Sequence, residues 1–221
     1  SGSDQVTLQT PASNNAVWDV DVTVNGGVPA EDTDRLIVQT PGAASETAVY
    51  TPSAADGGTL DLTSLSSLVT ITGTEALSYS GMGDNDSLTI VGTNGNDVFV
   101  HNPGANDQAG SIQVNSLLAL SYLTLGSTGS LTASGGAGTD TLVANGTAAN
   151  DSFTVGAAGQ VNLNSRVVLN VAGIETLWLE GFDGDDTSTL VPAISASVYT
   201  TMNFNGGAAA SATGDRVNLV A

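Results

Sequence analysis

The fold of this 221-residue chain is decided by one stretch, Gly135–Val143, which reads Gly-Gly-Ala-Gly-Thr-Asp-Thr-Leu-Val. It is a glycine-rich turn that ends in Asp140 and leads into a strand where apolar and small polar residues alternate. A second turn follows directly, from Gly146 to Asp151, and leads into the strand Ser152–Val155. Glycine and aspartate permit the backbone conformations of tight turns, and an alternation with a period of two buries one face of a strand.

The same double unit occurs upstream as Gly81–Ile90 and Gly92–Val100, with both halves offset by 54 residues (135 minus 81 and 146 minus 92). A degenerate third copy runs from Gly181 to Asp186, and more distant echoes lie at Gly26–Val38 and Gly206–Leu219. Turn chemistry that recurs at a fixed period indicates one supersecondary unit used several times. The pattern therefore predicts that equivalent strands stack in register along an axis.

The fold class expected from this pattern is all-β, because no segment places apolar residues at helical spacing. We expect a right-handed parallel β-solenoid of the β-helix or β-roll kind. A β-sandwich is the alternative, although it gives no reason for a 54-residue repeat. Residues 1–221 are expected to form one repeat-built domain, with atypical N-terminal strands over 1–25 and repeats over 26–221.

The composition is strongly acidic: 22 Asp and Glu residues stand against three Arg and no Lys, for a formal net charge of −19. Such a chain repels phosphate backbones and anionic membranes, so we expect no nucleic-acid binding. Membrane insertion is not expected either, because no apolar run approaches 18 residues. Cysteine is absent, so disulfides cannot stabilise the fold. Aspartate placed inside glycine-rich turns favours cation binding over solubility alone as the reason for the acidity.

Gly135–Val143 matches the nine-residue pattern Gly-Gly-x-Gly-x-Asp-x-apolar-x and resembles the haemolysin-type calcium-binding repeats of the repeats-in-toxin family. Gly92–Val100 fits with a threonine in the second place, and Gly81–Thr89 fits less well, because Met82 and Asp84 replace two glycines. In that family the turns form a parallel β-roll with calcium between successive turns, held by glycine carbonyls and the aspartate carboxylate. The resemblance implies Ca²⁺ as a cofactor, with these metal-site residues: Asp84, Asp86, Asp97, Asp140, Asp151, Asp186, Gly83, Gly95 and Gly138.

The chain also departs from the family pattern. The two turns of a pair begin 11 residues apart (92 minus 81) and are followed by strands without the motif, instead of forming an uninterrupted series. Ala149 stands where the third glycine should precede Asp151. An alternative interpretation therefore stays open, in which the turns supply positive-φ corners and side-chain hydrogen bonds and hold no metal.

No catalytic residue is predicted, and we expect the protein not to be an enzyme. The lone His101 is placed in an irregular loop at 101–111, without a recognisable nucleophile motif. A deep cleft with two carboxylates beside Arg166 would favour the alternative of a carbohydrate-active β-helix enzyme. A carbohydrate-binding module is a further alternative, but Trp18 and Trp178 lie in strand patterns, where packing at an edge or cap is expected.

The sequence therefore predicts a non-catalytic structural or adhesive module of a secreted or cell-surface bacterial protein, located extracellularly and stabilised by calcium. Sites of this kind can be tuned to roughly millimolar extracellular calcium. The expected partners are neighbouring copies stacked end to end, further tandem modules, and a surface polysaccharide.

Overall fold

A computed structural model describes residues 2–10, 17–27, 33–40, 42, 45–191 and 198–220. Within these ranges the chain is all-β, without a helix, as expected. Two long mixed sheets account for most of it, and a two-stranded pair, β18 (Asp183–Gly184) with β21 (Ala208–Ala209), lies beside them. None of these residues forms a helix that is long and apolar enough to cross a membrane.

The described strands of the first sheet number nine, and we call it the nine-stranded sheet. In spatial order they are β1 (Gln5–Gln9), β3 (Arg35–Gln39), β7 (Ala76–Ser80), β11 (Leu120–Leu123), β10 (Gly110–Val114), β9 (Val98–Pro103), β13 (Thr141–Asn145), β17 (Thr176–Glu180) and β20 (Thr201–Asn205).

The described strands of the second sheet number eleven, and we call it the eleven-stranded sheet. In spatial order they are β2 (Val22–Asn25), β6 (Val69–Thr72), β5 (Gly57–Leu62), β4 (Thr47–Ala54), β8 (Ser87–Val91), β12 (Ser130–Ser134), β16 (Val168–Ala172), β15 (Val161–Leu163), β14 (Ser152–Val155), β19 (Thr187–Leu190) and β22 (Arg216–Leu219).

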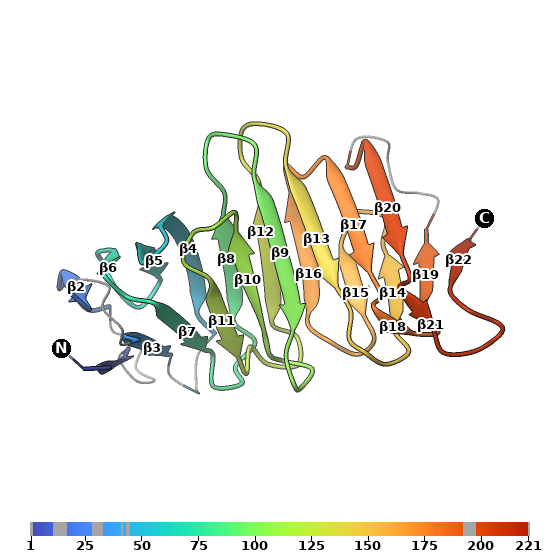
Figure 1. Ribbon diagram of the computed structural model, residues 1–221. Helices are drawn as coiled ribbons and strands as arrows, with labels where there is room; N and C mark the ends of the chain where they lie inside the picture. The colour runs from blue at the N-terminus through green and yellow to red at the C-terminus, as the bar shows by residue number, and fades with distance from the viewer. Residues whose placement is uncertain are drawn as a thin grey trace.

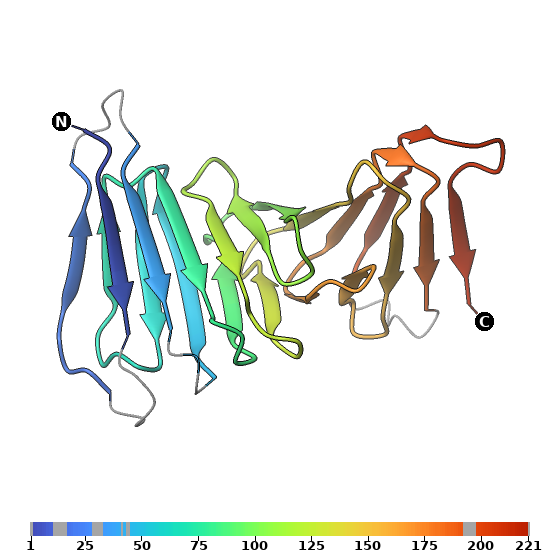
Figure 2. The ribbon, with the colours of Figure 1, turned by 90° about the horizontal axis from the view of Figure 1, so that it is seen from below.

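The chain passes back and forth between the two sheets as it advances. β1 belongs to the nine-stranded sheet, β2 to the eleven-stranded sheet, β3 to the nine-stranded sheet again, and the exchange continues to β22. Strands of alternate passes, which lie in the same sheet, pair in parallel, for example β13 with both β9 and β17. The two ends of the chain consequently lie at opposite ends of the molecule, and the colour runs from blue to red along it (Figure 1; Figure 2).

Three passes contain three antiparallel strands in place of one, so the sheets are mixed rather than purely parallel. These meanders are β4–β5–β6, β9–β10–β11 and β14–β15–β16. In each, the first strand lies farthest along the stack and the third lies back beside an earlier pass: β9 pairs with β13, and β11 with β7. The third strand thus lies next to the earlier strand of the same sheet, and the first strand lies two positions farther along the stack.

The meanders change the stacking that the repeat predicted. One 54-residue unit contains three passes, in the order β8, then β9–β11, then β12, and three is an odd number of crossings between two sheets. Equivalent strands of the two copies therefore lie in opposite sheets: β8 follows the turn at Gly81 in the eleven-stranded sheet, whereas β13 follows the turn at Gly135 in the nine-stranded sheet. The prediction that equivalent strands stack directly on each other was wrong.

One apolar cluster fills the space between the sheets. The alternation inferred from the sequence holds here, because Leu142 and Ala144 of β13 are buried while Thr141 and Val143 are only partly covered. The largest fully buried side chains include Tyr50, Tyr79 and Phe99. Tyr50 keeps a partner for its hydroxyl group, which donates to the carbonyl oxygen of Leu118 at 2.9 Å.

Candidate functional site

The predicted aspartates are almost completely buried, and each stands two residues before the first buried side chain of a strand. Exposed fractions range from 0 to 3% for Asp86, Asp97, Asp140, Asp151 and Asp186. The structure divides them between the two edges where the chain crosses from sheet to sheet. Asp86, Asp151 and Asp186 precede β8, β14 and β19 of the eleven-stranded sheet, whereas Asp97 and Asp140 precede β9 and β13 of the nine-stranded sheet.

Along each edge the carboxylate at one turn accepts a hydrogen bond from the backbone N–H of the acidic residue at the preceding turn of the same edge, which lies two passes earlier in the chain. Asp97 N donates to Asp140 Oδ1 at 2.8 Å, across 43 residues. Asp151 N donates to Asp186 Oδ1 at 2.8 Å, across 35 residues. These bonds form a ladder, which we call the carboxylate ladder, and it joins stacked passes at their turns. Further steps run from Asp4 to Asp34, Asp34 to Glu75, Glu46 to Asp86, Asp140 to Glu175 and Asp186 to Asp215.

The asparagine that precedes an aspartate reinforces the same connection. Asn96 Oδ1 accepts from Thr139 N, and Asn150 Oδ1 accepts from Asp185 N, both at 2.9 Å. Asn85, with φ of 69°, accepts in the same way from Thr128 N at 2.9 Å. The recurrent Asn-Asp pair thus supplies two acceptors for backbone amides of neighbouring turns.

Asp97 and Asp151 use both carboxylate oxygens within the protein. Asp97 accepts from Thr93 N at 2.6 Å and from Asn115 Nδ2 at 2.6 Å. Asp151 accepts from Thr147 N at 2.5 Å, and Asn164 Nδ2 donates to it at 2.7 Å.

The two asparagine donors were not predicted from the sequence. Asn115 and Asn164 have φ near 52°, stand at the ends of β10 and β15, and also accept from the amides of Val98 and Ser152. The one available signal was an Asn-Ser pair after a strand at both positions.

Both carboxylate oxygens of Asp86 also accept hydrogen bonds from the protein. Its Oδ1 accepts from Glu46 N at 2.7 Å, and its Oδ2 accepts from the Tyr79 hydroxyl at 2.7 Å and from Thr40 Oγ1 at 2.9 Å. Burial raises the pKa of this carboxyl group, although the hydrogen bonds act in the opposite direction. Burial and the neighbouring Asp86 likewise raise the pKa of Tyr79 far above its ordinary value, so its hydroxyl remains a donor.

Asp140 and Asp186 differ from the other three, because the Oδ2 atom of each is buried without a hydrogen-bond partner. Burial raises the pKa of both carboxyl groups. Each Oδ2 packs against the glycine five residues earlier in its own turn. A Cβ atom placed on Gly135 would lie 2.3 Å from Asp140 Oδ2, and one on Gly181 would lie 2.1 Å from Asp186 Oδ2. The missing side chain of that glycine makes room for the buried carboxylate.

The remaining residues of the predicted metal set lie around these turns. Gly83 and Gly138 have φ of 99° and 121°, which only glycine adopts readily, and the carbonyl oxygen of Gly95 lies against Gly138 of the next turn along the same edge. Gly83 N donates to the carbonyl oxygen of Thr124 at 2.7 Å. Asp84 Oδ2 is buried and has no hydrogen-bond partner.

These geometries limit how calcium fits. Calcium takes six to eight oxygen ligands, and no three His, Cys, Asp or Glu side chains gather closely enough for a metal in the parts of the chain that the structure describes. Both oxygens of Asp86, Asp97 and Asp151 already accept hydrogen bonds from protein donors, so an ion at these carboxylates would compete with those bonds. Asp84, Asp140 and Asp186 each have one carboxylate oxygen without a hydrogen-bond partner, so these three oxygens remain available to calcium.

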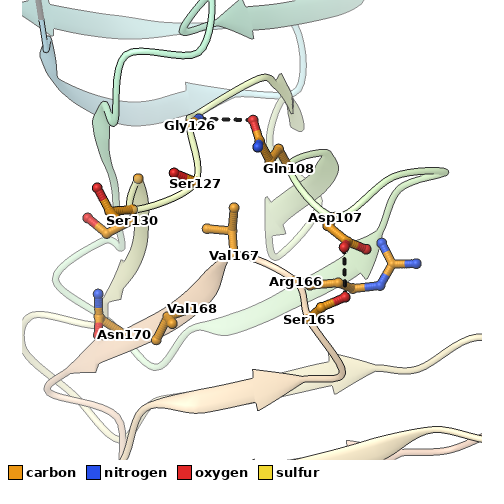
Figure 3. Close-up of a pocket in the computed structure, with 12 residues that line it drawn as sticks. Asp107, Gln108, Gly126, Ser127, Ser130, Ser165, Arg166, Val167, Val168 and Asn170 are labelled. Atoms are coloured by element: carbon orange, nitrogen blue, oxygen red, sulfur yellow. Dashed lines mark hydrogen bonds between the residues drawn. The ribbon is translucent and has the colours of Figure 1, made fainter.

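The pocket beside Arg166, in the part of the chain that the structure describes, lacks the pair of carboxylates that would favour a carbohydrate-active enzyme. A pocket of about 480 Å³ lies beside Arg166, but Asp107 is the one carboxylate among its lining residues, and Ser165 Oγ donates to it at 2.7 Å (Figure 3). Arg166 Nη1 donates to the carbonyl oxygens of Gly104 and Asn106 at 2.8 and 2.9 Å. The guanidinium group therefore fastens the loop between β9 and β10 to the turn before β16.

His101 was expected in a loop, and this expectation was wrong, because β9 continues through it to Pro103. Its ring is buried against Tyr122, and Nε2 lies 2.8 Å from the tyrosine hydroxyl. Burial, together with the Arg166 charge, lowers the pKa of His101 to about 4, so the ring is neutral at physiological pH. Its position in the core indicates a structural role.

Comparison of the chain with models of protein families, with curated proteins and with solved structures found no match.

Proposed function

We propose that the chain is a non-catalytic structural or adhesive module of a secreted or cell-surface protein, built as a right-handed β-solenoid. The observation that carries this proposal is the carboxylate ladder, because it commits most of the buried acidic groups to joining stacked passes at their turns. Parallel pairing of alternate passes within each sheet and the regular exchange between sheets support a solenoid over a sandwich. Each pass then buries its apolar face on its neighbours, and the outward faces of the two sheets remain available for contacts with other molecules.

In this proposal the turns keep their conformation without metal, and a calcium ion binds in addition at Asp140 and Asp186. We therefore expect the protein to stay folded in excess EDTA, because backbone amides already satisfy at least one oxygen of every ladder carboxylate except that of Asp4 at the start of the ladder. Thermal melts in EDTA, calcium and magnesium measure this. A rise specific to calcium that disappears in a D140N/D186N double variant would establish the two turns as ion sites. Unfolding in EDTA would contradict the proposal that the ladder alone holds the turns.

The ends of the stack support a second part of the proposal, that further tandem modules or neighbouring copies contact them. Val217 and Leu219 of β22 continue the inward-facing row of Ser188 and Leu190, yet they are 50 and 77% exposed. At the other end Val6 of β1 is 45% exposed. Apolar side chains that point toward a core position and remain uncovered favour a partner there.

We expect the chain to associate as its concentration rises, and L219K to weaken this association, because a lysine would carry charge into the contact. Sedimentation velocity over a hundredfold concentration range measures the effect. A T132K variant, on the outward face of β12 in the interior of the eleven-stranded sheet, is the control. A single monomeric species at every concentration, for the unchanged chain and L219K alike, would refute end-to-end contact between copies.

A further inference from the structure

The outer face of the nine-stranded sheet carries an exposed tryptophan on a strand that has a neighbouring strand on each side. Trp178 lies in β17, which pairs with β13 on one side and β20 on the other, and these strands lie side by side in Figure 1. Its neighbours Leu177 and Leu179 point into the core and are almost fully buried, whereas Trp178 is 41% exposed. The expectation that this residue packs at an edge or cap was therefore wrong.

Three rows of side chains cross this face at right angles to the strands. The central row places Trp178 between Val143 and Asn203. A hydroxyl row runs two residues before it, and an amide and carboxylate row runs two residues after it, each about 7 Å from the centre. The hydroxyl row consists of Thr141, Thr176 and Thr201, and the amide and carboxylate row consists of Asn102, Asn145, Glu180 and Asn205.

Side-chain contacts hold the amide and carboxylate row in place. Asn145 Nδ2 donates to Asn102 Oδ1, and Asn205 Nδ2 donates to Glu180 Oε2, both at 2.8 Å. The polar groups on this side of the ring are therefore oriented before any ligand arrives. Such preorganisation lowers the entropic cost of binding.

We propose that this face binds a neutral polysaccharide, with a pyranose ring stacked on Trp178 and its hydroxyl groups bonded to the two polar rows. A sugar ring presents C–H groups on its faces and hydroxyl groups at its rim, which matches an apolar ring flanked by donors and acceptors on both sides. The inference rests on the proposed adhesive role and assigns its ligand class.

Two observations disfavour other partners. The backbone groups of β17 are paired on both sides, so an extended peptide cannot bind there by adding a strand. The net charge of −19 and the carboxylate of Glu180 repel polyanions such as nucleic acids and acidic polysaccharides. A neutral polymer avoids that repulsion and uses the amide groups that the face provides.

The chain offers a matched control, because its second tryptophan, Trp18, is 39% exposed and lies outside this face, in an isolated bridge to Leu65. In a W18F variant Trp178 is the sole tryptophan, so its fluorescence reports contact directly. The probes are hydroxyethylcellulose and dextran as neutral β- and α-linked glucans, with alginate as the polyanion. We expect at least one neutral glucan to shift the emission of the W18F variant, and W178A to weaken binding about tenfold or more.

W18A should bind like the unchanged protein, and thermal melts should show that W178A remains folded, because the removed ring is exposed. Affinity for neither glucan, affinity that W178A leaves unchanged, or a preference for alginate would overturn the proposal. The same incubations are assayed for new reducing ends. If these appear, the non-catalytic function fails, whereas absence of both binding and cleavage removes the ligand assignment alone.

Discussion

Replacing Gly135 by alanine is expected to destabilise the protein by about 3 kcal/mol, at the upper end of the usual cost of overpacking a core. The added Cβ would lie 2.1 Å from the carbonyl oxygen of Gly173 and 2.3 Å from Asp140 Oδ2. The first contact is backbone of a neighbouring turn, and the second is the buried carboxylate that accepts from Asp97 N, so a shift of the carboxylate would disturb that ladder bond. For a chain of this length we expect the melting temperature to fall by about 6–12 °C, measured by circular dichroism.

Gly95 provides the control from the same nine-residue pattern. It is exposed, and the nearest atom to an added Cβ would be Thr93 Oγ1 at 3.6 Å. G95A should therefore change the free energy of unfolding by no more than about 0.5 kcal/mol. Equal effects of the two substitutions would contradict the packing of Asp140 beneath Gly135.

Asparagine in place of Asp97 is expected to reduce the free energy of unfolding by about 2–3 kcal/mol. Asp97 is 1% exposed, and its two oxygens accept from Thr93 N and from Asn115 Nδ2. An amide group retains one acceptor and turns its NH₂ toward a donor, so a buried N–H group loses its partner. Urea denaturation measures the loss.

The same substitution at Asp140 should have the opposite outcome, although the two residues occupy equivalent positions and are equally buried. Asp140 Oδ1 accepts from Asp97 N, but its Oδ2 faces no donor. D140N keeps the acceptor and removes a buried charge, so stability should stay the same or rise by up to about 1 kcal/mol at pH 8. Similar losses in D97N and D140N would show that the hydrogen bonds described for Asp97 do not matter.

The pH dependence of D140N follows from the raised pKa of Asp140. A carboxyl group that binds its proton more tightly in the folded state contributes stability at low pH and loses it as the pH rises through the folded-state pKa. The unchanged protein should therefore gain stability relative to D140N as the pH falls from 8 through that raised pKa toward the ordinary pKa of an aspartate. Urea titrations of both proteins at several pH values measure the difference. A difference that is constant with pH would mean that Asp140 is not desolvated.

The sequence predicted the all-β class and the turn positions because these depend on local patterns. Gly135 and Asp140 mark a turn, and the alternation in Thr141–Asn145 identifies a strand with one buried face. Glu75 and Glu175 each precede a strand, where the local sequence fits either an exposed side chain or a contact with a neighbouring strand. In the structure both carboxylates accept from a backbone amide of the preceding turn on the same edge, at 2.8 and 2.7 Å. Their role depends on a neighbour 41 and 35 residues away, which no local pattern specifies.

By itself the sequence determined that Asp86, Asp97, Asp140, Asp151 and Asp186 end tight turns and stand at the entrance to strands, because residue type and spacing fix local conformation. The tertiary structure alone decided which of these residues are neighbours. Asp97 lies beside Asp140 and not beside Asp151, its equivalent 54 residues later. The reason is that an odd number of passes in each repeat moves equivalent turns to opposite edges. Which oxygens remain free also depends on this stacking, because the amide donors come from other passes and from the ends of the meanders.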